Sequence, residues 1–283
     1  MDDDNPQYAI DHNPYCFTSD SFDASSFVGS GQDVAGDQGN SMARKSQPRP
    51  PSPLTIRVRL PGPRSLADTP SGDVENLRCV FKLLQPAAIT GCIVKYYALG
   101  YYGAAGTFRW EFDVCVPSSE LNRAAKIFDD NALYQRAKPP PKVCHSLRHM
   151  YPCFQLKGVM FYFLLVPSTQ YFFTPCPATI EHPKGSLPYP KMPELAQSLL
   201  VLQDRNNLAA FIDALDLDEA WGDKHIDFNR LNVEGRKFAA QHNETFLAQN
   251  LYGLSTDTDF WAVWVKLVRT KEARIWGRYG VHW

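Results

Sequence analysis

The chain has 283 residues, of which 44% are hydrophobic and 13% aromatic, enough for one large folded domain or two small ones. Its formal net charge of −1 at pH 7 gives no overall indication of a nucleic-acid partner or an anionic membrane surface. No apolar run approaches the roughly 18 residues of a membrane span, the N-terminus begins with acidic residues, and the seven scattered cysteines favour a reducing compartment. We therefore expect a cytoplasmic or nuclear protein without a membrane span or secretion signal.

Residues 1–72 are rich in Asp, Ser, Gly and Pro and contain few aliphatic residues. Such a segment buries too little apolar area to offset the entropy lost on ordering, so we predict a disordered, acidic and Pro/Ser-rich tail. Within it, residues 54–60 alternate apolar and polar side chains as a strand does. This pattern favours either an added edge strand or a short recognition motif, and we expect any protein partner to bind through the tail.

The folded part is predicted to begin near Asp73, a suitable N-cap for a helix that ends at Leu84. A strand over 90–94, a helix over 95–102 and a glycine-bearing turn then lead to a second strand over 108–116. A further helix follows Ser118 or Ser119, with an apolar stripe at helical spacing. These elements alternate between strand and helix, which is typical of a sheet covered by helices.

The apolar segment 153–166 is predicted to be a central strand or a hairpin covered on both faces. From Pro190 the apolar spacing becomes helical, with helices expected over 191–202, 208–215, 230–250 and 257–276. We therefore expect an α/β domain over 73–190, with a helical C-terminal subdomain over 191–283 packed on it.

The strand that ends at Val116 carries two acidic residues, Glu111 and Asp113. Successive side chains of a strand point to opposite faces, so these carboxylates share one face while Phe112 and Val114 enter the other. Two carboxylates on one face need a positive partner when buried, and Mg²⁺ is a common one. The alternatives are an exposed structural pairing with Arg109 or Lys95 and the binding of a nucleotide or metal without turnover.

The stretch 90–116 resembles a minimal, antitoxin-like nucleotidyltransferase domain. Residues 94–99 align with the family's Gly-Gly-x-Ala-Leu region, Gly103 with the following turn, and Glu111-Phe112-Asp113 with the metal-binding Asp-x-Asp triplet. The resemblance implies an α+β fold with a mixed sheet flanked by helices. It also implies that Glu111 and Asp113 act as catalytic residues that hold Mg²⁺.

From about Leu77 to Trp276 the chain also resembles a broad group of filamentous-fungal proteins with a degenerate version of this domain. The segments that carry this resemblance are 112–117, 156–168 and 187–191. Both resemblances imply a nucleoside triphosphate as ligand. Its phosphates would lie near Lys95, Tyr96 and Arg109.

Two features depart from the nucleotidyltransferase pattern. Lys95 and Tyr96 replace the glycine pair that lets phosphates approach a helix N-terminus, and residues 131–180 contain no Asp or Glu to supply a third carboxylate. The sequence therefore predicts metal-dependent nucleotide binding or nucleotidyl transfer with a degraded site. The alternative is a non-catalytic interaction or regulatory pseudoenzyme, attached to a fungal metabolic pathway.

Two further clusters have a functional and a structural interpretation. The carboxylate-free segment 131–180 holds five basic residues interleaved with aromatic ones, a combination that suits the binding of a phosphate chain or of single-stranded nucleic acid. The alternative is that these basic side chains lie at the surface and are balanced by acidic residues of other elements. The types and spacing of Cys144, His145, His149 and Cys153 suit zinc, but Pro152 argues against one helix that would present all four, and packing is the alternative.

Overall fold

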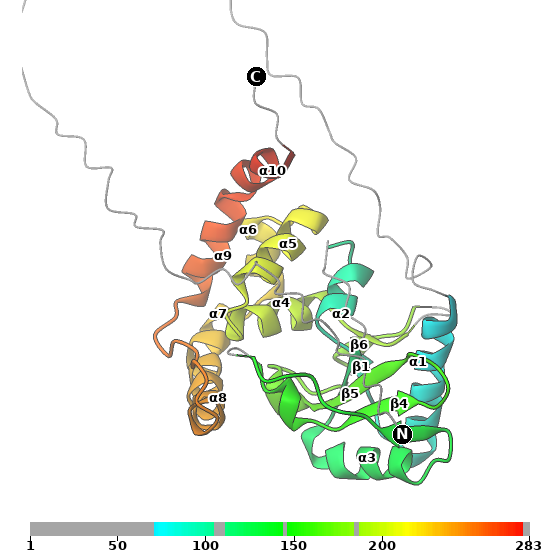
Figure 1. The fold of residues 1–283 in the computed structure, drawn as a ribbon. Coiled ribbons are helices and arrows are strands. Elements are labelled where there is room, and N and C mark those ends of the chain that lie inside the picture. The colour runs from blue at the N-terminus through cyan, green and yellow to red at the C-terminus, as the bar shows by residue number, and fades with distance from the viewer. Residues whose placement is uncertain (1–70, 105–110, 144–145, 184–186, 280–283) are drawn as a thin grey trace, which may run out of the picture. The chain divides into compact units, whose positions relative to one another are not determined.

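The computed structural model describes residues 71–104, 111–143, 146–183 and 187–279, and the side chains of 74–275 within them (Figure 1). The predicted tail over 1–72 lies outside the described residues, except for Ser71 and Gly72, which begin the first helix. The predicted strand over 54–60 also lies outside them. Among the described residues, no helix combines the length and apolar character needed to cross a bilayer.

Five strands form one mixed sheet in the order β1-β2-β5-β4-β3. Strands β2 and β5 are parallel, whereas the other neighbouring pairs are antiparallel. The five strands are β1 Cys92–Ile93, β2 Glu111–Val116, β3 Tyr134–Arg136, β4 Cys153–Leu156 and β5 Tyr162–Pro167. A separate two-stranded sheet is formed by β6 Ile180–Glu181 and β7 Tyr189–Pro190.

Helices flank the sheet and make up most of the C-terminal part, as the sequence predicts (Figure 1). The first three helices are α1 Ser71–Leu84, α2 Tyr96–Tyr101 and α3 Leu121–Asp129. The C-terminal part contains α4 Met192–Val201, α5 Arg205–Leu215, α6 Glu219–His225, α7 Phe228–Arg230, α8 Arg236–Ala248, α9 Phe260–Arg269 and α10 Lys271–Tyr279. A π-helical turn, Leu231–Gly235, joins α7 to α8.

The structure gives the detail of two predicted elements. The apolar segment 153–166 is a hairpin, one of the two forms predicted for it, in which β4 and β5 pair and Gly158 provides the turn with φ +83°. The single helix predicted over 257–276 is instead two helices, α9 and α10, separated at Thr270. The Thr270 hydroxyl donates to the Lys266 carbonyl at 2.8 Å, a local bond of the kind that bends helices.

The two faces of the sheet bury different clusters, as the alternation along β2 predicts. Phe112 and Val114 belong to the main core, which also contains buried residues of α1, α3, α4 and α5. Cys115 and Leu164 lie in a second buried cluster on the opposite face. Asp113 therefore points to the second face, where loop residues after β5 provide the cover.

Residues on both sides of position 190 contribute to the main core, and the rings of Tyr102 and Phe211 lie 5.5 Å apart in an edge-to-face contact. The division of the chain at residue 190 therefore stays a prediction. The C-terminal ends of β2 and β5 are tied together, because the hydroxyls of Ser118 and Ser168 lie 3.0 Å apart. Ser168 opens the loop that lies next to the acidic residues of β2.

Candidate functional site

The acidic residues of β2 meet one guanidinium group. Arg148 donates from Nε and Nη2 to Oδ1 of Asp113, at 2.9 and 2.7 Å. The same Nη2 lies 3.5 Å from Oε2 of Glu111. The two carboxylates therefore lie on the same side of β2, as the sequence predicts, and Arg148 bridges them.

This arrangement is largely removed from water. The side chains of Asp113 and Arg148 are only 4% and 8% exposed, whereas that of Glu111 is 30% exposed. Burial lowers the pKa of Arg148, but the charges of Asp113 and Glu111 outweigh it, so the pKa is raised and the guanidinium stays charged. Arg148 thus provides the opposite charge that a buried carboxylate such as Asp113 needs.

Lys95 supplies a second positive charge, which lies near the other carboxylate oxygen of Asp113. Its Nζ lies 3.7 Å from Oδ2 of Asp113. The backbone of Lys95 has φ 58° and ψ −130°, a conformation that glycine adopts easily and that costs other residues about 1–3 kcal/mol. The strained residue stands where the resemblance places a glycine pair, so the backbone keeps a glycine-like bend while the side chain neutralises Asp113.

The predicted site residues are thus only partly brought together. Glu111, Asp113 and Lys95 converge, and Tyr96 is half-buried as the first residue of α2. Arg109, predicted to bind substrate, lies outside the described residues. Sequence reasoning missed Arg148 as the main partner, although it lies in the acid-free basic segment, whose excess charge was the available signal.

The geometry does not fit a Mg²⁺ ion at this edge. On the neighbouring strand, Glu111 is paired with Tyr162 and Asp113 with Leu164, so β5 offers no third carboxylate. Within the described ranges no group of three or more His, Cys, Asp or Glu side chains could hold a metal. The Arg148 guanidinium also occupies the position between the two carboxylates that a cation would need.

Only part of the cluster whose residue types suit zinc lies within the described residues. Cys144 and His145 lie outside the described residues, and Cys153 is buried in β4. Burial, followed by the negative charge of Glu111, raises the pKa of Cys153 to about 11. Its thiol is therefore protonated at neutral pH, which disfavours both metal ligation and nucleophilic attack.

The basic segment 131–180 does not form one cationic surface among the described residues. Arg136 makes a two-pronged ion pair with Asp129 at 2.6 Å, and Arg148 is directed into the interior. Lys157 donates to the Ala132 carbonyl at 2.8 Å. Acidic groups and carbonyls from other elements thus engage these charges, which favours the structural interpretation.

A cavity of about 590 Å³ is lined in part by Tyr171, which belongs to the second buried cluster. The loop 168–174 forms one wall, and α7 with α8 forms the other through Arg230, Phe238, Gln241, His242 and Thr245. Burial, followed by the negative charge of Asp113, raises the pKa of the Tyr171 hydroxyl. No Asp or Glu is found among the described residues that line this cavity.

His242 lies on the helical wall of that cavity and is 7% exposed. Burial, and then the positive charge of Lys95, lower the pKa of His242 to about 4. The imidazole is therefore neutral at pH 7 and presents one donor and one acceptor. Tyr171 and His242, which both line this cavity, thus lie within electrostatic reach of Asp113 and of Lys95 respectively.

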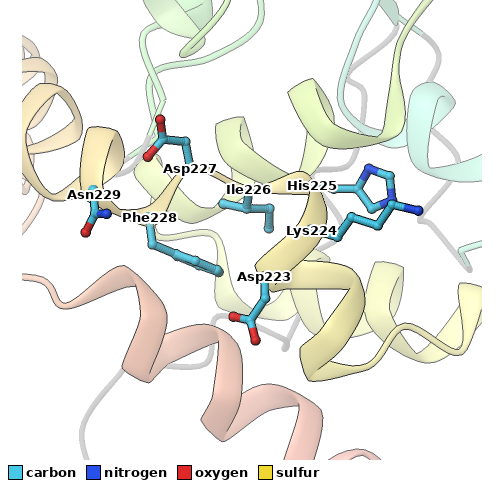
Figure 2. A pocket seen from close by; sticks show the side chains of 7 residues that line it. All are labelled: Asp223, Lys224, His225, Ile226, Asp227, Phe228 and Asn229. Atoms are coloured by element: carbon cyan, nitrogen blue, oxygen red, sulfur yellow. The ribbon is translucent and has the colours of Figure 1, made fainter.

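A second cavity, of about 460 Å³, is lined by residues 223–229 at the junction of α6 and α7. Figure 2 shows that Asp223, His225 and Asp227 extend in different directions from the ribbon. Asp227 is the N-cap of α7, since its Oδ1 accepts a hydrogen bond from the Arg230 backbone N–H at 2.9 Å. The ionisable groups do not converge, so this cavity is a weaker candidate for chemistry.

Comparison with known proteins shows distant structural similarity and no match of sequence. No protein-family model matches the sequence, and no curated protein matches it. Among solved structures, the chain is similar to the solution structure of the antibiotic-resistance factor ANT(2'')-Ia, with a TM-score of 0.33 and 7% sequence identity. The similarity covers 63% of this chain and 96% of that chain, and it concerns the arrangement of helices and strands alone.

Proposed function

We propose that this chain is a non-catalytic interaction or regulatory protein, built on the nucleotidyltransferase-like fold that its sequence resembles. The observation that carries the proposal is the Arg148 guanidinium, held between Glu111 and Asp113 by contacts of 2.7 to 3.5 Å. With Lys95, it supplies two positive charges against two negative ones. The acidic edge is neutral without a divalent ion.

A Mg²⁺ ion would have to displace this arrangement. Mg²⁺ requires near-octahedral oxygen ligands and sheds water reluctantly, so two carboxylates that are already ion-paired with a buried guanidinium are poor ligands for it. Moving Arg148 would leave a charged side chain without its partners in a site that is 8% exposed. We therefore propose that any nucleoside triphosphate binds without a requirement for Mg²⁺. A protein partner of the tail over 1–72 stays a prediction.

Calorimetry with ATP and with CTP, each with and without Mg²⁺, tests the proposal. We expect Mg²⁺ to change the affinity for either nucleotide by less than about twofold, because no ligand set is open to it. Glu111→Gln, which keeps shape at a half-exposed position and removes one charge, should behave as the wild type.

The competing hypothesis is a Mg²⁺-dependent nucleotidyltransferase. It predicts nucleotide binding that requires Mg²⁺, pyrophosphate release during incubation, and loss of both in Glu111→Gln. Either of the first two results would overturn the non-catalytic assignment. A matched titration of Asp129→Asn, a surface variant on α3, would identify changes that arise from charge alone.

A further inference from the structure

We propose that the cavity between the loop 168–174 and α8 binds an uncharged ligand that has a flat aromatic ring and an amide-like polar group. The inference goes beyond the proposed function, because it concerns a different set of side chains from the bridged carboxylates. It rests on the place of the cavity in the fold, on the side chains that form its walls and on the compensation of its charges.

The cavity lies at the end of the sheet where ligands commonly bind. Its first wall, the loop 168–174, begins directly after the C-terminal end of β5, which runs parallel to β2. In open α/β sheets, ligands commonly bind in the crevice outside the carboxyl ends of the strands. The second wall contains residues on both sides of the π-helical turn Leu231–Gly235. Such turns are rare and occur frequently at functional sites, so both walls favour a binding site.

The walls combine aromatic rings with uncharged polar side chains. Phe172 and Phe238 come from different walls, and their rings lie 5.8 Å apart in an edge-to-face contact. The His242 ring is stacked on Phe238 at 5.3 Å, with an angle of 19° between their planes. Amides and hydroxyls also line the cavity, from Thr169, Gln170, Thr174, Gln241 and Thr245. The volume of about 590 Å³ is typical of small-molecule sites, and such walls suit a flat ring with a polar group.

The charges at the cavity are already compensated. Arg230 is the one charged side chain among the described residues that line it, and its Nε lies 2.5 Å from Oε2 of Glu234. His242 is neutral at pH 7, because burial and then the charge of Lys95 lower its pKa to about 4. A charged ligand would lose its hydration here without meeting an uncompensated charge, so the cavity favours an uncharged ligand.

Ligand-observed NMR on the full chain at pH 7 tests the inference with four small molecules. Benzamide has the expected ring, amide and charge. Benzoate and benzamidine are its anionic and cationic analogues, and cyclohexanecarboxamide keeps the amide without a flat ring. We expect benzamide to bind saturably with a Kd of about 10 mM or tighter, which is ordinary for a ligand of its size. The other three should each bind at least about threefold more weakly.

Two variants test whether benzamide binds in this cavity. Phe238→Leu removes a ring from one wall but keeps an apolar side chain, and it should weaken benzamide binding about fivefold. Gln241→Ala removes an amide at an exposed position of α8, where alanine favours the helix, and should weaken binding about threefold. Phe228→Leu makes the first substitution in the other cavity and should change nothing (Figure 2).

The inference is overturned if benzamide does not bind saturably, or if any of the other three molecules binds as tightly as benzamide does. It is also overturned if binding is unchanged in both Phe238→Leu and Gln241→Ala. If circular dichroism shows that Phe238→Leu is unfolded, Gln241→Ala alone decides. None of the four molecules carries phosphate or requires Mg²⁺, so failure here is distinguishable from failure of the non-catalytic assignment.

Discussion

Replacing Arg148 by alanine should destabilise the protein by about 3 kcal/mol or more, because it leaves Asp113 buried without its main partner. Asp113 is 4% exposed and accepts two hydrogen bonds from the guanidinium. Lys95, at 3.7 Å, offsets part of the loss but does not reach hydrogen-bonding distance. Urea denaturation of the full chain, followed by circular dichroism, measures the change in the free energy of unfolding.

Two further variants test whether the loss of stability comes from breaking the Asp113–Arg148 ion pair or from substitution in general. Asp113→Leu combined with Arg148→Met should recover most of the lost stability, because apolar residues of similar size often replace a buried ion pair without cost. Arg136→Ala breaks the half-exposed pair with Asp129 and should cost only about 1 kcal/mol or less. A double variant as unstable as Arg148→Ala would show that Asp113 is not held mainly by this guanidinium.

Lys95→Gly should be more stable than Lys95→Ala by about 1–2 kcal/mol, which reverses the usual order of the two residues. Both variants lose the contact with Asp113, so they differ only in the backbone. Glycine adopts φ 58° and ψ −130° without steric cost, whereas alanine retains the strain. The midpoint of thermal unfolding of the two variants, measured side by side, gives the difference.

Lys126 is the matched control, since it is an exposed lysine in the helical backbone of α3 with an ion pair to Asp130. There Lys126→Gly should be less stable than Lys126→Ala by about 1 kcal/mol, because glycine is the poorer helix former. The same order at both positions would contradict the strained backbone of Lys95.

The local elements of this fold could be predicted because their signals are local. Alternation along β2 placed Phe112 and Val114 in the main core and both carboxylates on the opposite side. The mixed sheet, the flanking helices and the helical C-terminal part are confirmed by the strand order and element bounds. The break at Thr270 was missed, since no Gly or Pro marks it in the sequence.

The site itself depends on contacts that a single sequence does not encode in any local pattern. Arg148 is 35 positions from Asp113, and nothing in its own neighbourhood distinguishes it from the other basic residues of its segment. The positive φ of Lys95 cannot be deduced from the residue type. Its alignment with a glycine pair was the indication that the sequence offered. Tyr171 and His242 come together only through packing of α8 against the loop that follows β5.

Anomalous diffraction from crystals grown with Mn²⁺, a stand-in for Mg²⁺, tests the central claim most directly. We expect Arg148 to remain within hydrogen-bonding distance of Asp113, with no Mn²⁺ between the carboxylates of Asp113 and Glu111. An Mn²⁺ ion ligated by both carboxylates, with Arg148 displaced, would contradict the claim that a side chain occupies the position of the metal.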